Sequence, residues 1–118
     1  MSKLCAWFDI PVADMDRAVQ FYEKVTGRTL MRAQLPEGKE TANFGMDGCL
    51  FKASEDEPSH KGSRVYFSAE PSIEDWITRI EASGGRILVP KTPIGEGKGH
   101  FAYFEDSEGN RVGLHSPG

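Results

Sequence analysis

The most constraining feature of this sequence is that its second half repeats the pattern of its first half. A helix pattern begins at the N-cap residue Asp14 and ends at Gly27, and a similar pattern begins at Ser72 and ends at Gly84-Gly85. The two N-caps are 58 positions apart, and the same interval relates Gly27 to Gly85. A chain of 118 residues has room for one domain, so we expect the two halves to share one core.

Apolar residues recur on one face of each predicted helix, at the spacing of a helix that packs against a sheet. They are Met15, Ala18, Val19, Tyr22 and Val25 in the first helix and Ile73, Trp76, Ile77 and Ile80 in the second. We predict that these side chains lie in the core.

Each predicted helix follows one short strand-like segment and precedes three others. The segments are 4–12, 28–34, 40–46 and 49–53 in the first half and 64–69, 86–89, 100–105 and 111–115 in the second. Asp47-Gly48 is a strong hairpin signal between two of them. The predicted fold class is therefore α+β, a single domain of tandem β-α-β-β-β units (1–53 and 64–118) joined by the polar linker 54–63.

Composition and charge exclude several classes of function. The formal net charge is −4, and the lysines and arginines are scattered rather than gathered into the basic stripe of a nucleic-acid-binding protein. No segment approaches the roughly 18 uninterrupted apolar residues of a transmembrane helix, and Asp9 comes too early for a secretory signal peptide. We expect a cytoplasmic protein without nucleic-acid or membrane partners, in which Cys5 and Cys49 stay reduced.

Two segments resemble the vicinal oxygen chelate superfamily. Trp7–Tyr22 resembles its opening strand, Asp cap and Phe-Tyr-containing helix, and Phe104–His115 resembles its closing hairpin. Together with the duplicated unit, the resemblance spans essentially the whole chain and is nearest to the glyoxalase-like and bleomycin resistance-like proteins. It implies curved mixed sheets around a cavity for a small-molecule ligand, usually completed in a homodimer.

The resemblance also implies where a divalent metal would be bound, because most enzymes of the superfamily hold one with four side chains from four strands. The corresponding positions here are Trp7, Arg64 or Val65, Phe51 or Lys52, and Gly113. We prefer Arg64 to Val65, because Val65 would then face the helix. None of these residues is a usual ligand of a divalent cation, so we expect no metal cofactor at the usual site.

Strand alternation identifies other side chains that would face the cavity. Asp9 shares a face with Trp7, and His115 shares one with the vacated ligand position. Tyr66 alternates with the helix-facing residues of its strand, and His100 follows the glycine-rich segment 95–99, which we predict to be a lid. We predict that Trp7, Asp9, Tyr66, His100 and His115 bind the ligand. Their aromatic members favour a flat or apolar molecule.

Several functions remain open from the sequence. One is a metal-independent protein that binds a small, aromatic or apolar molecule by sequestration or as a sensor. Another is a metal-dependent lyase, isomerase or dioxygenase, similar to lactoylglutathione lyase, with a rearranged site that uses Asp9, His115 and His100. A structural domain is disfavoured, because an unused cavity would be free to fill with apolar side chains. The sequence names no catalytic residue and does not decide whether a reaction is catalysed.

Overall fold

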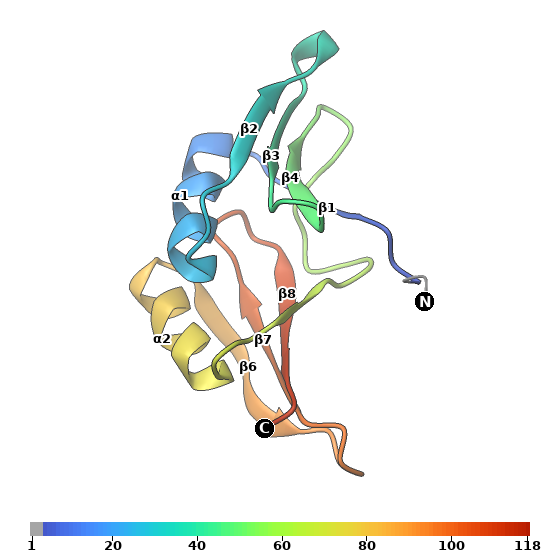
Figure 1. Cartoon of the computed structure of the whole chain (residues 1–118). Helices are drawn as coiled ribbons and strands as arrows, with labels where there is room; N and C mark the ends of the chain where they lie inside the picture. Colours follow the sequence, from blue (N-terminus) through green and yellow to red (C-terminus); the bar gives the residue numbers. More distant parts are fainter. Residues whose placement is uncertain (1–3) are drawn as a thin grey trace.

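The computed structural model describes residues 4–118, and its elements follow the order β-α-β-β-β twice (Figure 1). The first unit contains β1 (Phe8–Pro11), α1 (Met15–Thr26), β2 (Met31–Gln34), the short 3-10 helix η1 (Pro36–Gly38), β3 (Glu40–Asn43) and β4 (Gly48–Lys52). The second unit contains β5 (Tyr66–Ser68), α2 (Ile73–Ala82), β6 (Arg86–Pro93), β7 (His100–Glu105) and β8 (Arg111–Ser116). The predicted α+β class is confirmed.

Each unit forms one four-stranded mixed sheet. The strand orders are β1-β4-β3-β2 and β5-β8-β7-β6, so corresponding strands take corresponding places. The first strand of each unit pairs parallel with the last, and the remaining pairs are antiparallel. The two sheets therefore repeat one topology, as the sequence pattern predicts.

Both helices begin at the predicted N-caps, and α1 ends at the predicted glycine, whereas α2 ends at Ala82 with Ser83 as its C-cap. The Asp14 side chain accepts a hydrogen bond from the Arg17 N–H at 3.0 Å, and the Ser72 hydroxyl accepts one from the Asp75 N–H at 3.1 Å. Gly27 ends α1 in the left-handed region, with φ +71°, which a glycine adopts without strain. In the described part of the chain, neither helix is long and apolar enough to cross a membrane.

One core joins the two units. The apolar helix residues predicted to be buried are buried or, for Ile77, partly buried against the core. Phe67 of β5 connects the units, because its ring centroid lies 5.9 Å from those of Phe8 and Tyr22 and 5.7 Å from that of Phe44. In Figure 1, α1 and α2 lie side by side along one flank of the molecule, and their contact is direct. Each sheet thus has an inner face toward this core and an outer face away from it.

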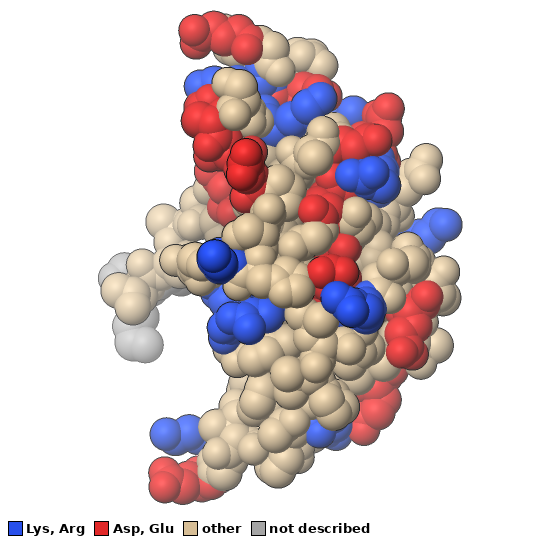
Figure 2. Space-filling view, turned by 180° about the vertical axis from the view of Figure 1, so that it is seen from behind, with Lys and Arg blue, Asp and Glu red and all other residues tan. Residues whose placement is uncertain are grey.

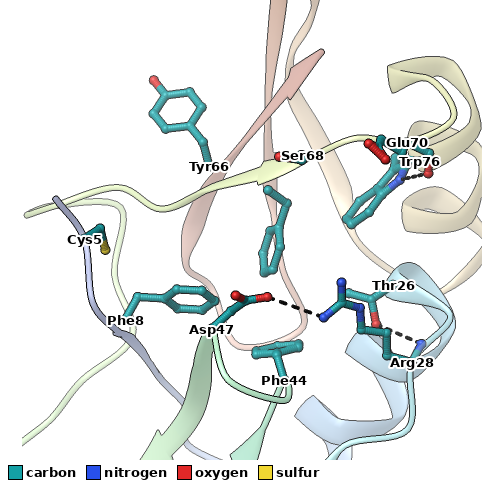
Figure 3. Close-up of a pocket in the computed structure, with 11 residues that line it drawn as sticks. Cys5, Phe8, Thr26, Arg28, Phe44, Asp47, Tyr66, Ser68, Glu70 and Trp76 are labelled. Atoms are coloured by element: carbon teal, nitrogen blue, oxygen red, sulfur yellow. Dashed lines mark hydrogen bonds and ion pairs between the residues drawn. The ribbon is translucent and has the colours of Figure 1, made fainter. Parts of the chain in front are cut away.

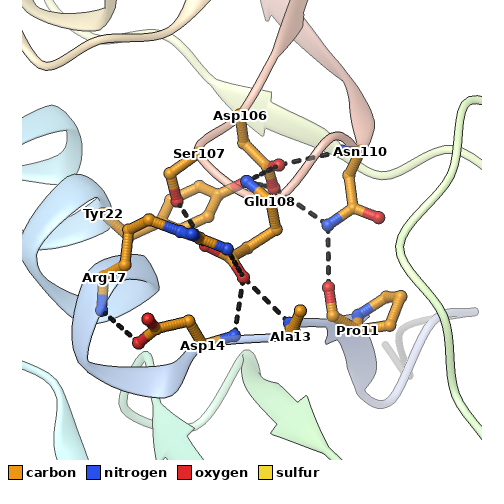
Figure 4. A network of polar contacts seen from close by, with 9 residues as sticks. All are labelled: Pro11, Ala13, Asp14, Arg17, Tyr22, Asp106, Ser107, Glu108 and Asn110. Carbon is orange, nitrogen blue, oxygen red and sulfur yellow. Dashed lines mark hydrogen bonds and ion pairs between the residues drawn. The ribbon is translucent and has the colours of Figure 1, made fainter.

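The turn between β7 and β8 docks onto the start of α1 (Figure 4). The Glu108 carboxylate accepts hydrogen bonds from Arg17 Nε at 2.7 Å and from the backbone N–H groups of Ala13 and Asp14 at 2.8 Å each. Beside it, Asp106 accepts a hydrogen bond from the Tyr22 hydroxyl at 2.7 Å. The two units are therefore fixed to each other by a polar network as well as by the core.

The linker 54–63 is tied to the second unit. The Ser59 N–H donates to the Asn110 side chain at 3.2 Å, and the Ser59 carbonyl accepts from the Arg111 N–H at 3.3 Å. His60 Nε2 lies 2.6 Å from Glu105 Oε2. The linker thus binds β7, β8 and the turn between them through its Ser59 backbone and the His60 side chain.

One difference from the predicted strands is in β6, which continues to Pro93 instead of ending at residue 89. It is the outermost strand of its sheet, where a residue without an N–H group is tolerated. Its pairing with β7 shifts register between Val89 and Thr92, on either side of Pro90. A proline therefore did not end this strand, because an edge strand has one side without hydrogen-bond partners.

Candidate ligand-binding site

A cavity of about 590 Å³ opens on the outer face of the second sheet. Its lining residues are Tyr66, Ser68, Ile94, Phe101, Tyr103 and His115. Alternation along the strands explains this set, because the intervening residues Phe67, Ala102 and Leu114 belong to the core. The volume lies within the range of small-molecule sites, and most of the wall is aromatic or aliphatic.

Two tyrosines and an arginine form a hydrogen-bonded group at this cavity. The hydroxyls of Tyr66 and Tyr103 are 2.8 Å apart, and Arg64 Nη1 donates to Tyr103 at 2.9 Å and to Tyr66 at 3.3 Å. The Arg64 guanidinium carbon lies 4.3 Å from the centroid of the Tyr103 ring, a cation–π distance. The sequence indicated Arg64 and Tyr66 at this place, but not their partner Tyr103.

The hydrogen bond between the two tyrosines makes the pKa of one lower and that of the other higher than the ordinary value. Burial alone would raise the pKa of Tyr66, but the hydrogen bonds with Tyr103 and Arg64 outweigh it, so that this pKa is lowered. The hydrogen bond with Tyr66 raises the pKa of Tyr103. Of the pair, Tyr66 is therefore the more acidic group.

His115 links the cavity to the glycine-rich loop between β6 and β7. Its Nε2 lies 2.9 Å from the Lys98 carbonyl oxygen, which only accepts hydrogen bonds, so Nε2 is the donor. The loop closes on itself, because the Ile94 N–H donates to the Gly99 carbonyl at 2.9 Å. His115 and Ile94 both line the cavity, so the loop that we predict to be a lid borders it.

Trp7 and Asp9 lie on the first sheet, away from this cavity. The Trp7 indole N–H donates to Asp9 Oδ1 at 2.9 Å, and the Cys49 thiol donates to the same oxygen at 3.2 Å. Burial and the neighbouring Asp9 raise the pKa of Cys49 to about 12, so this thiol stays protonated at neutral pH. The structure thus brings Trp7 and Asp9 together on one sheet and Tyr66 and His115 together on the other.

His100, which we expect to contact the ligand after the glycine-rich segment, is not among the residues that line this cavity. Phe101 and Tyr103 line the cavity, whereas Ala102 and Phe104 are fully buried in the core. His100 therefore lies on the helix side of β7, where it acts electrostatically on Glu74 of α2. Both faces of β7 carry apolar residues, so the sequence has no polarity contrast that indicates which face is outward.

Backbone hydrogen bonds define which strand positions of the two units correspond. The Val12 N–H donates to the Phe51 carbonyl at 3.0 Å, and the Ala69 N–H donates to the His115 carbonyl at 2.8 Å. Val12 and Ala69 are 57 positions apart, one fewer than the helix N-caps. Trp7 therefore corresponds to Arg64, which confirms the preference for Arg64 over Val65.

The same hydrogen bonds correct the interpretation of the last strands. Because Phe51 corresponds to His115, Cys49 corresponds to Gly113. Neither Phe51 nor Lys52 stands at the position equivalent to Gly113. The residue that sequence reasoning missed is Cys49, which lies two positions earlier on β4.

Of the four residues at the positions that the resemblance implies for metal ligands, only Cys49 is of a type that binds a divalent cation. Trp7 offers an indole N–H and Arg64 a guanidinium, neither of which has a lone pair for a metal. A β-carbon added at Gly113 would lie 2.4 Å from the Tyr66 ring, so that ring fills the space of a ligand side chain. Within residues 4–118, no three His, Cys, Asp or Glu side chains are grouped so as to hold a metal ion.

A second cavity, of about 530 Å³, lies between the two units (Figure 3). Its walls include the core aromatics Phe8, Phe44 and Trp76. Arg28 and Asp47 face each other in Figure 3 as an ion pair at 3.5 Å. Its main charged groups are thus paired with each other, so we treat the cavity on the outer face of the second sheet as the candidate ligand site.

Charged side chains are spread over the surface in both signs. Seen from behind (Figure 2), acidic and basic groups are intermixed over the upper part of the molecule. The lower part, which the second unit forms in Figure 1, presents a broad area without charged side chains. The surface in this view therefore has mixed charge above and, below, a central area without charged side chains that has charged groups at its edges.

Comparison with known proteins identifies the family. Residues 5–114 match the family model of the Glyoxalase/Bleomycin resistance protein/Dioxygenase superfamily. The chain is also 30% identical over 112 residues to metallothiol transferase FosB of Shouchella clausii (strain KSM-K16), covering 89% of this chain and 74% of FosB. The chain therefore belongs to the glyoxalase/bleomycin resistance protein/dioxygenase superfamily, which is the vicinal oxygen chelate family that its sequence resembles.

Solved structures show the same fold. The fosfomycin resistance protein FosX of Listeria monocytogenes superposes with a TM-score of 0.70 at 18% identity, covering 98% of this chain and 94% of FosX. A glyoxalase I mutant from Zea mays gives a TM-score of 0.72 at 19% identity, covering 96% of this chain but 46% of the maize chain. A mutant of FosX has been solved with Mn(II) and 1S,2S-dihydroxypropylphosphonic acid. At these identities the likeness concerns the fold alone.

Proposed function

We propose that this protein binds a small aromatic or apolar molecule in the cavity on the outer face of the second sheet, without a divalent metal at the superfamily's usual position. The observation that carries the proposal is the cavity itself, about 590 Å³ with Tyr66, Phe101, Tyr103 and Ile94 in its wall. Aromatic walls of this kind stack on flat ligands and remove them from water.

The polar groups at the cavity support binding more than turnover. The two tyrosine hydroxyls and Arg64 form hydrogen bonds with one another, and the Nε2–H of His115 donates a hydrogen bond to the Lys98 carbonyl. This leaves Nδ1 of His115 as an acceptor for a hydrogen bond from the ligand. Such an arrangement orients a bound molecule and suits sequestration or sensing.

The alternative is a metal-dependent lyase, isomerase or dioxygenase. The names of relatives favour it, since FosB is called a metallothiol transferase and one FosX structure contains Mn(II). It would use Asp9, His115 and His100. Asp9 lies on the outer face of the first sheet and His115 on the outer face of the second, whereas His100 lies on the helix side of the second sheet. One chain does not assemble these three side chains, so we place this function second.

We also propose that a second copy of the chain completes the site. Trp7 is 42% exposed on the first sheet and Tyr66 is 46% exposed on the second, so the outer faces of both sheets are open in one chain. Light scattering coupled to gel filtration is expected to give twice the chain mass of 13.1 kDa. A mass of one chain would contradict the homodimer.

The binding proposal is tested by calorimetry with a flat neutral molecule, 2-naphthamide. We expect binding to the wild type and a loss of about tenfold or more in affinity in Phe101→Ala, which removes one wall of the cavity. The matched control is Met31→Ala, a 70% exposed apolar residue on the first sheet, which should leave the affinity unchanged. Equal affinities for wild type and Phe101→Ala would sink the proposal.

Metal analysis separates the two functions. After dialysis of the purified protein against Zn, Ni, Mn and Fe(II) in turn, we expect far less than one metal per chain. Retention of about one metal per chain, lost in Asp9→Ala or His115→Ala, would favour the enzyme instead.

A further inference from the structure

Two arginines flank Tyr103 beside the cavity, and neither has an acidic partner among residues 4–118. Arg64 uses Nη1 for the tyrosine hydroxyls, while its Nε and Nη2 make no hydrogen bond to any residue in 4–118. Arg111 has its guanidinium carbon 5.7 Å from the Tyr103 ring centroid and a buried Nε without a hydrogen-bond partner among the described residues. The surroundings of Tyr103 therefore carry uncompensated positive charge.

The remaining arginines of the chain all form ion pairs. These pairs are Arg17–Glu108, Arg28–Asp47, Arg32–Asp16, Arg79–Asp75 and Arg86–Glu105. The chain has 18 acidic residues against 14 lysines and arginines, so partners are plentiful. The two arginines without a carboxylate within 4.0 Å in the described chain both lie against the ring of Tyr103, which lines the cavity, and this points to an anion from outside the chain.

The hydroxyl groups beside Arg64 are also short of an acceptor. One tyrosine hydroxyl donates its proton to the other across 2.8 Å, and Arg64 donates to both oxygens. Whichever tyrosine donates, the second hydroxyl keeps one proton for a further hydrogen bond. The free groups around Tyr103 are therefore all donors, and a donor-only region selects an acceptor-only group, such as a carboxylate.

Arg64 also occupies one of the four positions at which the resemblance implies a metal ligand, because it corresponds to Trp7. On this basis, and resting on the proposed function, we infer that the ligand is a flat aromatic carboxylate whose two oxygens bind the Arg64 guanidinium in place of a metal ion. The planar guanidinium presents parallel N–H groups that match two neighbouring oxygens. Stacking on Tyr103 holds its plane fixed and leaves the Nε and Nη2 edge free.

The test compares two probes of nearly equal shape, 2-naphthoate and neutral 2-naphthamide, by calorimetry at pH 7. We expect the wild type to bind naphthoate about tenfold or more tightly than naphthamide, and this preference to weaken as salt rises. Arg64→Gln should abolish the preference while leaving naphthamide within about twofold of its wild-type affinity, and Arg64→Lys should retain part of it. The matched control is Arg86→Gln in the same sheet, whose guanidinium pairs with Glu105, and its preference should equal that of the wild type.

The outcomes separate the two proposals. If wild type and Arg64→Gln bind both probes equally well, the anion inference is overturned and the aromatic binding function stands. If the wild type binds neither probe, the aromatic site itself is overturned and the inference with it. Unchanged naphthamide binding in Arg64→Gln also shows that this variant is folded. A lost preference for naphthoate is then caused by the removal of the Arg64 charge.

Discussion

The ring of Tyr66 lies across Gly113 on the neighbouring strand, so that a β-carbon added to Gly113 would stand 2.4 Å from Cδ2 of the ring. The two residues are register partners in the parallel pairing of β5 with β8. In metal-binding relatives, the resemblance places a carboxylate at the position of Gly113. Here β8 has no side chain at this point, and the phenol ring that occupies the space is part of the cavity wall.

Gly113→Ala is expected to lower the free energy of unfolding by about 1–3 kcal/mol, because the Tyr66 ring must leave its position to admit the methyl group. In a Tyr66→Ala background, the loss of unfolding free energy caused by Gly113→Ala should be smaller by about 1 kcal/mol or more, because the obstructing ring is absent. Urea denaturation of the wild type, the two single variants and the double variant measures this coupling. Strictly additive costs would show that the ring and the glycine do not constrain each other.

The sequence predicts the elements of this fold better than it predicts which way the strand side chains face. Asp14 and Ser72 mark both helix starts because N-capping is local chemistry, readable from a few residues. The face of β7 on which His100 lies does not follow from the sequence, because β7 has Phe101 and Tyr103 on one side and Ala102 and Phe104 on the other. With apolar residues on both sides, the direction of each side chain is set by pairing with β8, a contact that local pattern does not contain.

Part of the candidate site is likewise fixed by contacts that are distant in the sequence. Arg64 and Tyr66 follow from alternation once one inserted residue is allowed before Ser72. Their partner Tyr103 is reached only through the sheet, 39 residues after Arg64. Cys49 is hidden for the same reason, because its equivalence to Gly113 depends on the parallel pairing of the first and last strands in each unit.

His115→Ala is expected to loosen the glycine-rich loop between β6 and β7. The substitution removes the hydrogen bond to the Lys98 carbonyl, which costs about 0.5–1.5 kcal/mol of local stability. Hydrogen exchange of the Lys98 amide, which donates to the Gly95 carbonyl at 3.1 Å, should become faster by several-fold. His60→Ala is the control, because His60 binds Glu105 and not the loop. Equal hydrogen-exchange rates of the Lys98 amide in His115→Ala and His60→Ala would show that His115 does not stabilise the loop.

Two glycines of the same loop separate backbone strain from steric obstruction. Gly97 and Gly99 both have positive φ, +71° and +89°, so an alanine at either position is strained by about 1–2 kcal/mol. At Gly99 the added β-carbon would also lie 2.2 Å from the Ser116 carbonyl oxygen, whereas Gly97 faces open space. Gly99→Ala should therefore destabilise the protein by about 1 kcal/mol or more beyond Gly97→Ala in thermal or urea unfolding. Equal costs would mean that β8 yields to the methyl group.

The contact between the β7–β8 turn and the start of α1 should make the free energy of unfolding depend on pH. Burial alone would raise the pKa of Glu108, but the hydrogen bonds from Arg17, Asp14 and Ala13 outweigh it, so that this pKa lies below its ordinary value. The folded state thus binds the Glu108 proton more weakly than the unfolded state does. The stabilisation is present above the unfolded pKa of about 4.3 and is lost as the pH falls through the lower, folded pKa.

Glu108→Gln removes this charge, and its expected cost is about 1.5–3 kcal/mol at pH 7, since the side chain is fully buried against Arg17. The difference from the wild type should narrow as the pH falls below about 4, because the wild-type carboxylate is then protonated as well. Urea unfolding at neutral pH and near pH 3 measures both values. Glu81→Gln, at an exposed position of α2, is the control and should differ little from the wild type at either pH. A cost for Glu108→Gln that stays constant with pH would show that the charge of Glu108 does not stabilise the join between the units.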